Sequence, residues 1–357
     1  MYKNNYHHCI IQLVHTLAHH FDGTSPDYLS NLLPHLEPYK KIILVLIDGL
    51  GLQNLKDLSQ QAGFLYTHLF DTIDTVYPPT TVAATTSLVT GKEPVTTGWL
   101  GWYQYFQEYQ DHYVMFLNQS YYNYKPSVKP IRELVPYHYF WENLPIQAYT
   151  YAPFPCYDNK EGYENLEGMI KALQMNLKKD EKQYHYFYYD KLDELMHKNG
   201  TQHEVVQKEF NDIQNQLETL ASSLDQDTQM IVIADHGHID VEGIYLGDYP
   251  DLLECLEYPP SLEGRTMAFK VKDKEKFETL FHHYFDPDFK LYSYEEILQQ
   301  QLFGIGEVHL YFKDFIGDFI AVGITNKMFY TKKPNTMKGN HAGMTKTEIQ
   351  IPLIVIK

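Results

Sequence analysis

Apolar, β-branched runs that end abruptly at a polar residue recur along the chain. The run KIILVLI at 41–47 ends at Asp48, and the run IVIA at 231–234 ends at Asp235. A third run, YHYFYY, occupies 184–189. Continuous apolar runs of this length predict strands that are buried on both faces, which is the pattern of a mainly parallel sheet.

Helical patterns fill the stretches between these strands. Residues 204–224 have the apolar spacing of an amphipathic helix, and 164–179 shows the same periodicity. Residues 51–63 and the small-residue segment 82–91 are also expected to be helical. The final apolar run, 349–356, is expected to return to the main sheet. This alternation predicts an α/β fold, with a mostly parallel sheet between helices.

The pattern changes after a Tyr-Pro-Pro turn at 258–260. Residues 265–272 alternate like an exposed strand, and 274–285 has a helical pattern. Shorter strand and helix patterns follow at 289–291, 295–301 and 319–324. We therefore expect 258–335 to form a small α+β insertion, or cap, on a catalytic core made of 1–257 and 336–357.

Charge limits the partners of the chain. Its 357 residues include 46 acidic and 29 basic side chains, for a formal net charge of −17. This balance argues against a nucleic acid polymer or an anionic membrane as a partner, because phosphate backbones require a basic surface. A small phosphorylated substrate, such as a nucleotide, remains compatible, since bound divalent cations reverse the local field. The oligomeric state is left open.

Cysteine usage and the N-terminus bear on the cellular compartment. Cys9, Cys156 and Cys255 are odd in number and widely spaced, which argues against a disulfide framework and against thiolate zinc sites. The first residues lack the apolar region of a signal peptide. No apolar run is long enough for a membrane span. We therefore expect a cytoplasmic protein.

Carboxylates, imidazoles and hydroxyls gather where the predicted strands end. Ligands in α/β proteins bind at the carboxyl ends of strands, and these side chains suit two divalent ions with positions left open for substrate. Two such ions typify phosphoryl-transfer enzymes. The threonines lie on a turn that opens a helix, where backbone N–H groups favour an anion. The residues concerned are Asp48, Thr80, Thr81, Asp193, His197, Asp235, His236 and His341.

Taken singly, each of these residues also suits a structural role. Asp48 is compatible with an ordinary strand-ending turn, and Thr80 or Thr81 with a helix cap. Asp193 and His197, four residues apart, are equally compatible with a solvated helical pair. The complete set is much harder to obtain by chance than any one member.

Five segments together resemble the alkaline phosphatase superfamily, specifically its type I phosphodiesterase/nucleotide pyrophosphatase branch. They occur in the family's order and span nearly the whole chain. The segments are VLIDGL (45–50), YPPTTVAATTSLVTGKEP (77–94), YYDKLDELMHKNG (188–200), IVIADHGH (231–238) and GNHAGMTKTEIQIPLIV (339–355). The resemblance implies an alkaline phosphatase-like α/β core and a metal-dependent hydrolase of phosphate esters, most consistent with a phosphodiesterase or nucleotide pyrophosphatase.

The resemblance also implies a role for each matching position. Thr81, rather than the preceding Thr80, matches the nucleophile that forms a covalent phosphothreonine. The ion beside the nucleophile would be held by Thr81, Asp48, Asp235 and His236. A second ion would be held by Asp193, His197 and His341. Zn²⁺ suits this Asp/His set best, and Mn²⁺ suits it as well.

Departures from the family pattern leave alternatives open. Eukaryotic relatives carry an Asn three residues after the nucleophile, where this chain has Ala84. The same scaffold also supports phosphomonoesterases and phosphonate hydrolases, and a binding protein that keeps the metals without turnover is a further alternative. His238 either lines the pocket or is structural. Tyr and Trp residues at 99–124 are candidates for stacking on a flat leaving group.

Overall fold

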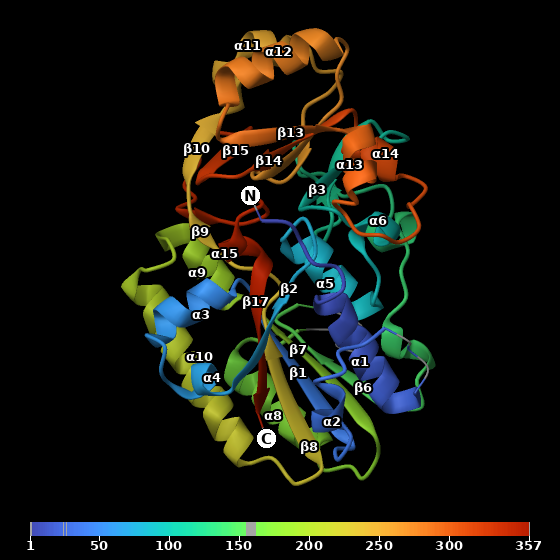
Figure 1. Cartoon of the computed structure of the whole chain (residues 1–357), viewed down its shortest axis with the longest axis vertical. Coiled ribbons are helices and arrows are strands. Elements are labelled where there is room, and N and C mark those ends of the chain that lie inside the picture. The colour runs from blue at the N-terminus through green and yellow to red at the C-terminus, as the bar shows by residue number, and fades with distance from the viewer. Residues whose placement is uncertain (1, 24, 26, 155–161, 357) are drawn as a thin grey trace.

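A six-stranded sheet forms the centre of the computed structural model, which describes residues 2–23, 25, 27–154 and 162–356 (Figure 1). Its strand order is β2-β17-β8-β1-β7-β6. β1 runs parallel to both β7 and β8, and β6 runs parallel to β7. β17 is antiparallel to both of its neighbours, and it returns to the sheet between β2 and β8, as expected. The strands span Lys41–Ile47 (β1), Leu69–Asp74 (β2), Gln147–Tyr151 (β6), Gln183–Tyr189 (β7), Thr228–Ile233 (β8) and Gln350–Ile356 (β17).

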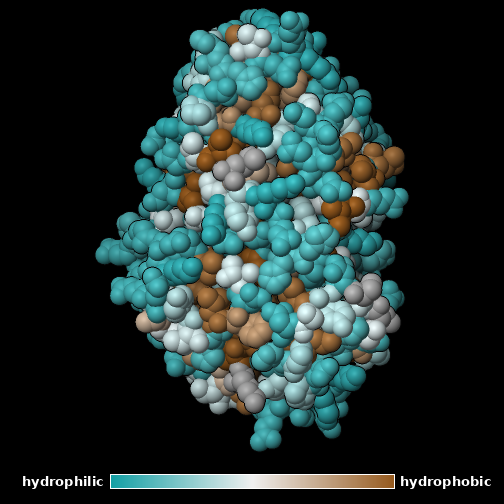
Figure 2. All heavy atoms as spheres, viewed as in Figure 1, coloured by the Kyte–Doolittle hydropathy of each residue, from teal (hydrophilic) through white to brown (hydrophobic). Residues whose placement is uncertain are grey.

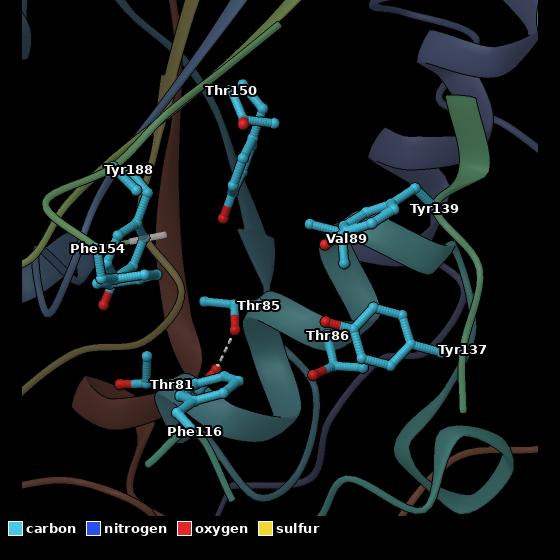
Figure 3. A pocket seen from close by; sticks show the side chains of 12 residues that line it. Thr81, Thr85, Thr86, Val89, Phe116, Tyr137, Tyr139, Thr150, Phe154 and Tyr188 are labelled. Atoms are coloured by element: carbon cyan, nitrogen blue, oxygen red, sulfur yellow. Dashed lines mark hydrogen bonds between the residues drawn. The ribbon is translucent and has the colours of Figure 1, made fainter. Parts of the chain in front are cut away.

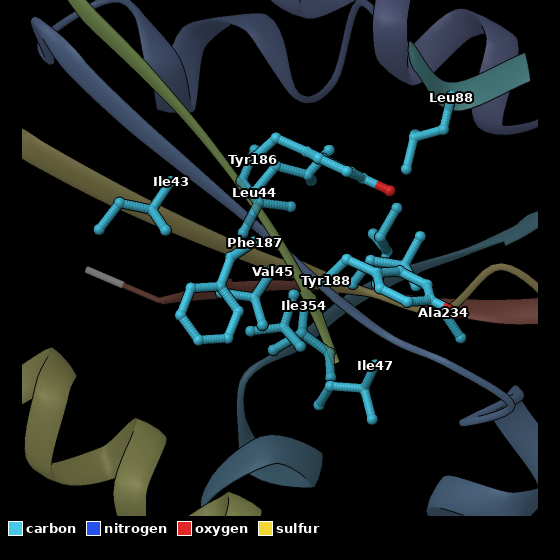
Figure 4. Packing of buried hydrophobic residues seen from close by; sticks show 14 of the residues in the cluster. Ile43, Leu44, Val45, Ile47, Leu88, Tyr186, Phe187, Tyr188, Ala234 and Ile354 are labelled. Carbon is cyan, nitrogen blue, oxygen red and sulfur yellow. The ribbon is translucent and has the colours of Figure 1, made fainter. Parts of the chain in front are cut away.

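Helices cover both faces of this sheet, so the predicted mostly parallel α/β core is confirmed. Figure 1 shows α3, α9 and α10 on one side, and α1 and α5 on the other. Alternate residues along the central strands face the two layers, so that Tyr186 points toward Leu88 while Phe187 and Val45 point away (Figure 4). The helices are α1 (Ile10–Asp22), α3 (Leu52–Ser59), α5 (Thr81–Thr90), α8 (Leu166–Asn176), α9 (Lys191–Asn199) and α10 (Glu204–Ser222).

A second, antiparallel sheet has the strand order β13-β14-β12-β11-β3-β4-β5. The segment 258–335 supplies four of these strands, whereas β3, β4 and β5 come from the aromatic-rich region. The two parts join where β11 pairs with β3, at Leu262 and Tyr103. This second sheet, which we call the cap sheet, is therefore built from two separated stretches of the chain. Its strands are β3 (Tyr103–Phe106), β4 (Asp111–Val114), β5 (Gln119–Ser120), β11 (Ser261–Leu262), β12 (Thr266–Phe269), β13 (Phe289–Ser293) and β14 (Phe319–Gly323).

Shorter elements complete the described chain. Two two-stranded sheets pair β10 with β15 and β9 with β16. These strands are β9 (Ile239–Asp240), β10 (Glu242–Tyr245), β15 (Lys327–Tyr330) and β16 (Gly339–Asn340). The helices beside the cap sheet are α11 (Pro250–Glu254), α12 (Lys274–Phe285), α13 (Tyr294–Gln300) and α14 (Phe312–Ile316). The other short helices are α2 (Leu33–Leu36), α4 (Phe64–Thr67), α6 (Pro94–Thr97), α7 (Ile131–Leu134) and α15 (Lys346–Ile349).

The expectation of an exposed strand at 265–272 is wrong. β12 is buried along its whole length, because it lies between β14 and β11 with an apolar cluster on each face. Phe269 packs on Phe277 of α12 with ring centroids 5.1 Å apart, while Ala268 faces the other cluster. Alternate side chains of β12 therefore point into two different hydrophobic clusters, and neither face of the strand points to solvent.

The face in Figure 2 is mostly hydrophilic, with scattered hydrophobic patches. Cys9 and Cys255 are free, and Cys156 lies outside the described residues. Within the described part of the chain, no helix has the length and apolar character needed to cross a membrane.

A buried ion pair ties the cap sheet to α15, the short helix between the His341 loop and β17. Arg265 and Glu348 are fully buried, and the guanidinium Nε and Nη2 donate to the two carboxylate oxygens at 2.7 and 2.9 Å. Glu348 also accepts from the backbone N–H of Gly343 at 2.7 Å. Because every charged atom has a partner, the pair fixes the loop without leaving a bare charge in the core.

We expect Arg265→Leu to lower the free energy of unfolding by about 3–5 kcal/mol, because Glu348 would be left as a buried, unpaired carboxylate. Urea unfolding followed by circular dichroism measures this loss. Lys171→Ala is the matched control, since it removes an exposed Lys171–Glu167 pair and should cost about 0.5 kcal/mol or less. Equal losses in the two variants would contradict the structural role of the buried pair.

Candidate metal centre

Two neighbouring parallel strands deliver the first acidic residues to one edge of the sheet. β1 and β8 are in register up to Leu46 and Ile233, so the residues that follow them emerge side by side. Asp48 and Asp235 occupy these positions and are almost completely buried. The backbone N–H of Gly49 donates to Asp235 Oδ1 at 3.1 Å, which locks the two strand ends together.

The imidazole of His236 is the common neighbour of this first cluster. Its Nε2 lies 3.3 Å from Asp48 Oδ1 and 3.4 Å from Asp235 Oδ2. Thr81, the first residue of α5, places its hydroxyl 3.2 Å from the same nitrogen and 3.4 Å from Asp48 Oδ2. Two carboxylates, one imidazole and one hydroxyl thus lie close together at this edge of the sheet.

A second cluster lies beside the first. Asp193 and His197 share one face of α9, with His197 Nε2 3.3 Å from Asp193 Oδ2. His341, in the loop after β16, brings its Nε2 to 4.0 Å from Asp193 Oδ1. The His341 and His236 rings stack with centroids 3.7 Å apart, so the two clusters are in direct contact.

His238 joins the second cluster, which goes beyond the pocket-lining or structural role considered from the sequence. Ligand atoms of Asp193, His197, His238 and His341 lie within 4.8 Å of one another. His238 Nε2 is 2.8 Å from Asp193 Oδ1, so its N–H donates to the carboxylate and fixes its orientation. Asn54 in turn holds the backbone of His238 through its N–H and C=O, at 2.9 and 3.1 Å.

Backbone carbonyls set the tautomers of the other three histidines. The Nδ1 atoms of His197, His236 and His341 lie 2.9, 3.3 and 3.1 Å from carbonyl oxygens. A carbonyl only accepts, so each Nδ1 carries the proton. Each Nε2 therefore presents a lone pair to the cluster, which is the arrangement of metal-ligating histidines.

The donor atoms fit divalent cations. Among the described residues, Asp48 Oδ1 and Asp235 Oδ2 are buried and accept no hydrogen bond. Burial and the neighbouring carboxylates raise the pKa of Asp48 well above its usual value, and burial raises the pKa of Asp235 to about 7. Burial lowers the pKa of His236 to about 3, which keeps its ring neutral. Unsatisfied carboxylate oxygens beside neutral imidazoles suit a bound cation.

Two further groups at the site were missed from the sequence. The hydroxyl of Tyr188, the penultimate residue of β7, donates to Asp48 Oδ2. Glu263, at the end of β11, accepts from the Thr80 hydroxyl at 2.6 Å. Both bonds join residues far apart in the chain. Tyr188 opens the segment 188–200, but nothing in that segment indicates a bond to Asp48, and Glu263 lies outside all five segments.

Ala84 contributes no polar group to the site. It is fully buried and packs into the main hydrophobic cluster, one turn along α5 from Thr81. Residue 84 therefore cannot make the phosphoryl contact that the resemblance assigns to the Asn of eukaryotic relatives.

A pocket opens directly beside Thr81 (Figure 3). It encloses about 70 Å³, and the described residues of its walls are mostly apolar and include no Lys or Arg. It is lined by Thr81, Thr85, Thr86, Val89, Phe116, Tyr137, Tyr139, Thr150, Ala152, Phe154, Tyr186 and Tyr188. Of the aromatic residues at 99–124, only Phe116 reaches it. Tyr103 and Tyr105 already stack on Tyr121 and Tyr258, with centroids 3.8 and 3.6 Å apart.

Comparison with solved structures shows where this fold occurs. Murine ectonucleotide pyrophosphatase/phosphodiesterase 5 matches with a TM-score of 0.63 and 17% identity, over 88% of this chain and 87% of that chain. An inactive form of the murine protein in complex with AMP gives 0.64 and 16%, with the same coverage. The human protein gives 0.62 and 17%, again over 88% and 87%. No curated protein sequence matches the chain significantly.

The sequence profile of the type I phosphodiesterase/nucleotide pyrophosphatase family matches residues 42–344. This range begins in β1 and ends after His341, so it contains every residue of both clusters. The chain therefore belongs to the type I phosphodiesterase/nucleotide pyrophosphatase family of the alkaline phosphatase superfamily, and it is a phosphodiesterase-type hydrolase.

Proposed function

We propose that this chain hydrolyses small phosphodiesters through a covalent phosphothreonine on Thr81, assisted by two divalent ions. The observation that carries the proposal is the position of the Thr81 hydroxyl. It lies between the first cluster, at Asp48 and His236, and the mouth of the apolar pocket. A phosphorus atom placed there can be attacked while its ester group occupies the pocket.

The ligand sets support one ion at each cluster. Asp48, Asp235, His236 and Thr81 would hold the first, and Asp193, His197 and His341 the second. When bound, such ions lower the pKa of a coordinated hydroxyl and stabilise the charge on phosphoryl oxygens. Zn²⁺ is the ion we propose, because three imidazoles and three carboxylates match its preferred donors, with Mn²⁺ as the second candidate.

The residues of the chain account for the two chemical steps. Thr81 Oγ1, having lost its proton to water, attacks phosphorus in line, and the P–O bond to the leaving alcohol breaks as that alcohol takes up a proton. The N–H groups of the first turn of α5 donate to phosphoryl oxygens. Water then attacks the phosphothreonine, which restores the Thr81 hydroxyl and releases a phosphate monoester.

The pocket supports a diester over a monoester. A monoester dianion is usually recognised by Arg or Lys side chains, and the described residues that line the pocket include neither. A nucleotide is a candidate substrate, because one structural neighbour is described in complex with AMP. Phosphomonoester and phosphonate hydrolysis on the same scaffold remain the alternatives, as does metal binding without turnover. Comparing a diester, a monoester and a C–P substrate separates these reactions.

Thr81→Ala should lower kcat on bis(p-nitrophenyl) phosphate by about 10³-fold or more, because the attacking oxygen is removed. Stopped assays with metal content checked measure this loss. Thr90→Val is the control at the far end of the same helix, since its hydroxyl donates to the Thr86 carbonyl and accepts from the Lys92 N–H, and its activity should stay close to wild type. A Thr81→Ala protein that keeps both ions and full activity would rule out the covalent mechanism.

Metal binding should release protons and strengthen as pH rises through about 7. The raised pKa values of Asp48 and Asp235 mean that these carboxyls hold protons near neutral pH until an ion displaces them. His236, whose pKa lies at about 3, releases none. Calorimetric titration of Zn²⁺ at pH 6 and pH 8, in buffers of different ionisation enthalpy, measures the protons released. Affinity independent of pH would contradict this prediction.

A further inference from the structure

The turn that carries the nucleophile is held from outside by a carboxyl group of the cap sheet. Glu263 follows β11, and its Oε1 accepts from the Thr80 hydroxyl at 2.6 Å. The same oxygen accepts from the backbone N–H of Trp102 at 2.7 Å. One atom therefore joins the nucleophile turn, the cap sheet and the segment that leads into β3.

The environment of Glu263 is unusual for a carboxyl group. The residue is only 8% exposed, and within the described ranges no Lys or Arg forms an ion pair with it. Arg265, two residues away, is committed to Glu348. Burial raises the pKa of Glu263 to about 7, although the hydrogen bonds from Thr80 and Trp102 act to lower it, and the Asp193 carboxylate of the second cluster also raises it. Burying a carboxyl group costs free energy unless hydrogen bonds replace the lost hydration, and here the bonds from Thr80 and Trp102 do so.

The bond to Glu263 changes what Thr80 does at the start of α5. Thr80 is the N-cap residue, a position where a threonine oxygen ordinarily accepts from an N–H of the first turn. Here its side chain makes no capping bond. The hydroxyl is turned toward Glu263 instead, so the first-turn N–H groups beside Thr81 are not satisfied by the cap.

We propose that Glu263 is a positioning residue for phosphoryl transfer: through Thr80, it keeps the N-terminus of α5 open to the phosphoryl oxygens and fixes the direction of the Thr81 hydroxyl. This inference rests on the proposed function, since it assigns a role in the reaction of Thr81. It is distinct from ion binding, because neither Glu263 nor Thr80 belongs to the two ligand clusters. It also gives the cap sheet a direct part in the reaction.

The test compares variants that break and preserve the Thr80–Glu263 bond. Thr80→Val and Glu263→Ala should each lower kcat on bis(p-nitrophenyl) phosphate by about 10–100-fold, with KM changed by about threefold or less. Thr80→Ser and Glu263→Gln, which keep a donor and an acceptor, should recover most of the activity. The double variant Thr80→Val/Glu263→Ala should be no slower than either single variant, because both act through one bond.

Binding of orthovanadate to the zinc-loaded protein provides a readout that does not depend on turnover. Calorimetry should show about 10–100-fold weaker vanadate binding in Thr80→Val and Glu263→Ala, with unchanged zinc content. Tyr77→Phe is the matched control, because it removes another buried bond between the nucleophile segment and the cap sheet, at 2.7 Å to Thr266. It should lower the unfolding midpoint while leaving kcat and vanadate affinity within about twofold of wild type.

The outcomes separate this inference from the proposed function. Wild-type kcat and vanadate affinity in Thr80→Val, or losses that multiply in the double variant, would overturn the positioning role. An equal loss of kcat and vanadate affinity in Tyr77→Phe would show that general destabilisation causes the effect, and it would also overturn the positioning role. If Thr81→Ala stayed active with both ions bound, the covalent mechanism would fail, while the vanadate measurements would still decide the role of Glu263.

Discussion

The structure is organised around carboxylates that are buried at the end of the main sheet. β1 and β8 bring Asp48 and Asp235 together, and α9 adds Asp193 beside them. Moving a carboxylate out of water costs several kcal/mol. Repulsion between two such charges ~4 Å apart adds about 4 kcal/mol at an effective dielectric constant of 20. Protonation or a bound cation relieves this strain, and the neutral Nε2 atoms that face the cluster favour the cation.

The main sheet could be predicted from the sequence because its signal is local. Each central strand is a continuous apolar run, and Asp48 and Asp235, the proposed ligands, follow β1 and β8 directly in the sequence motifs. The cap sheet could be predicted only in part. β3 and β11 are short, and they pair across about 160 residues of chain, so their own composition does not reveal the partner. The burial of β12 was missed for the same reason, since the pattern of one strand does not show that a core lies on both faces.

The proposed ligands could be found by motif, whereas the hydrogen bonds that support them could not. Tyr188 and Glu263 act through single hydrogen bonds to Asp48 and Thr80, over separations of 140 and 183 residues. Such bonds depend on how strand ends and turns meet in space. His238 lies within a recognised segment, yet only the structure shows that its ring faces Asp193.

One turn of the cap sheet acts on both sides of the centre. Arg265 binds Glu348, which also holds the backbone of Gly343, two residues after His341. Glu263 binds Thr80, one residue before Thr81. A shift of this turn would therefore move a ligand of the second ion and the nucleophile together. The apolar pocket meets this charged network at Thr81 and Tyr188, which both line it and both bond to Asp48. Apolar side chains farther along the wall, such as Val89 and Phe116, carry no charge. They can therefore change to suit a different ester group without altering the charges that govern the reaction, which separates the choice of substrate from the chemistry performed on it.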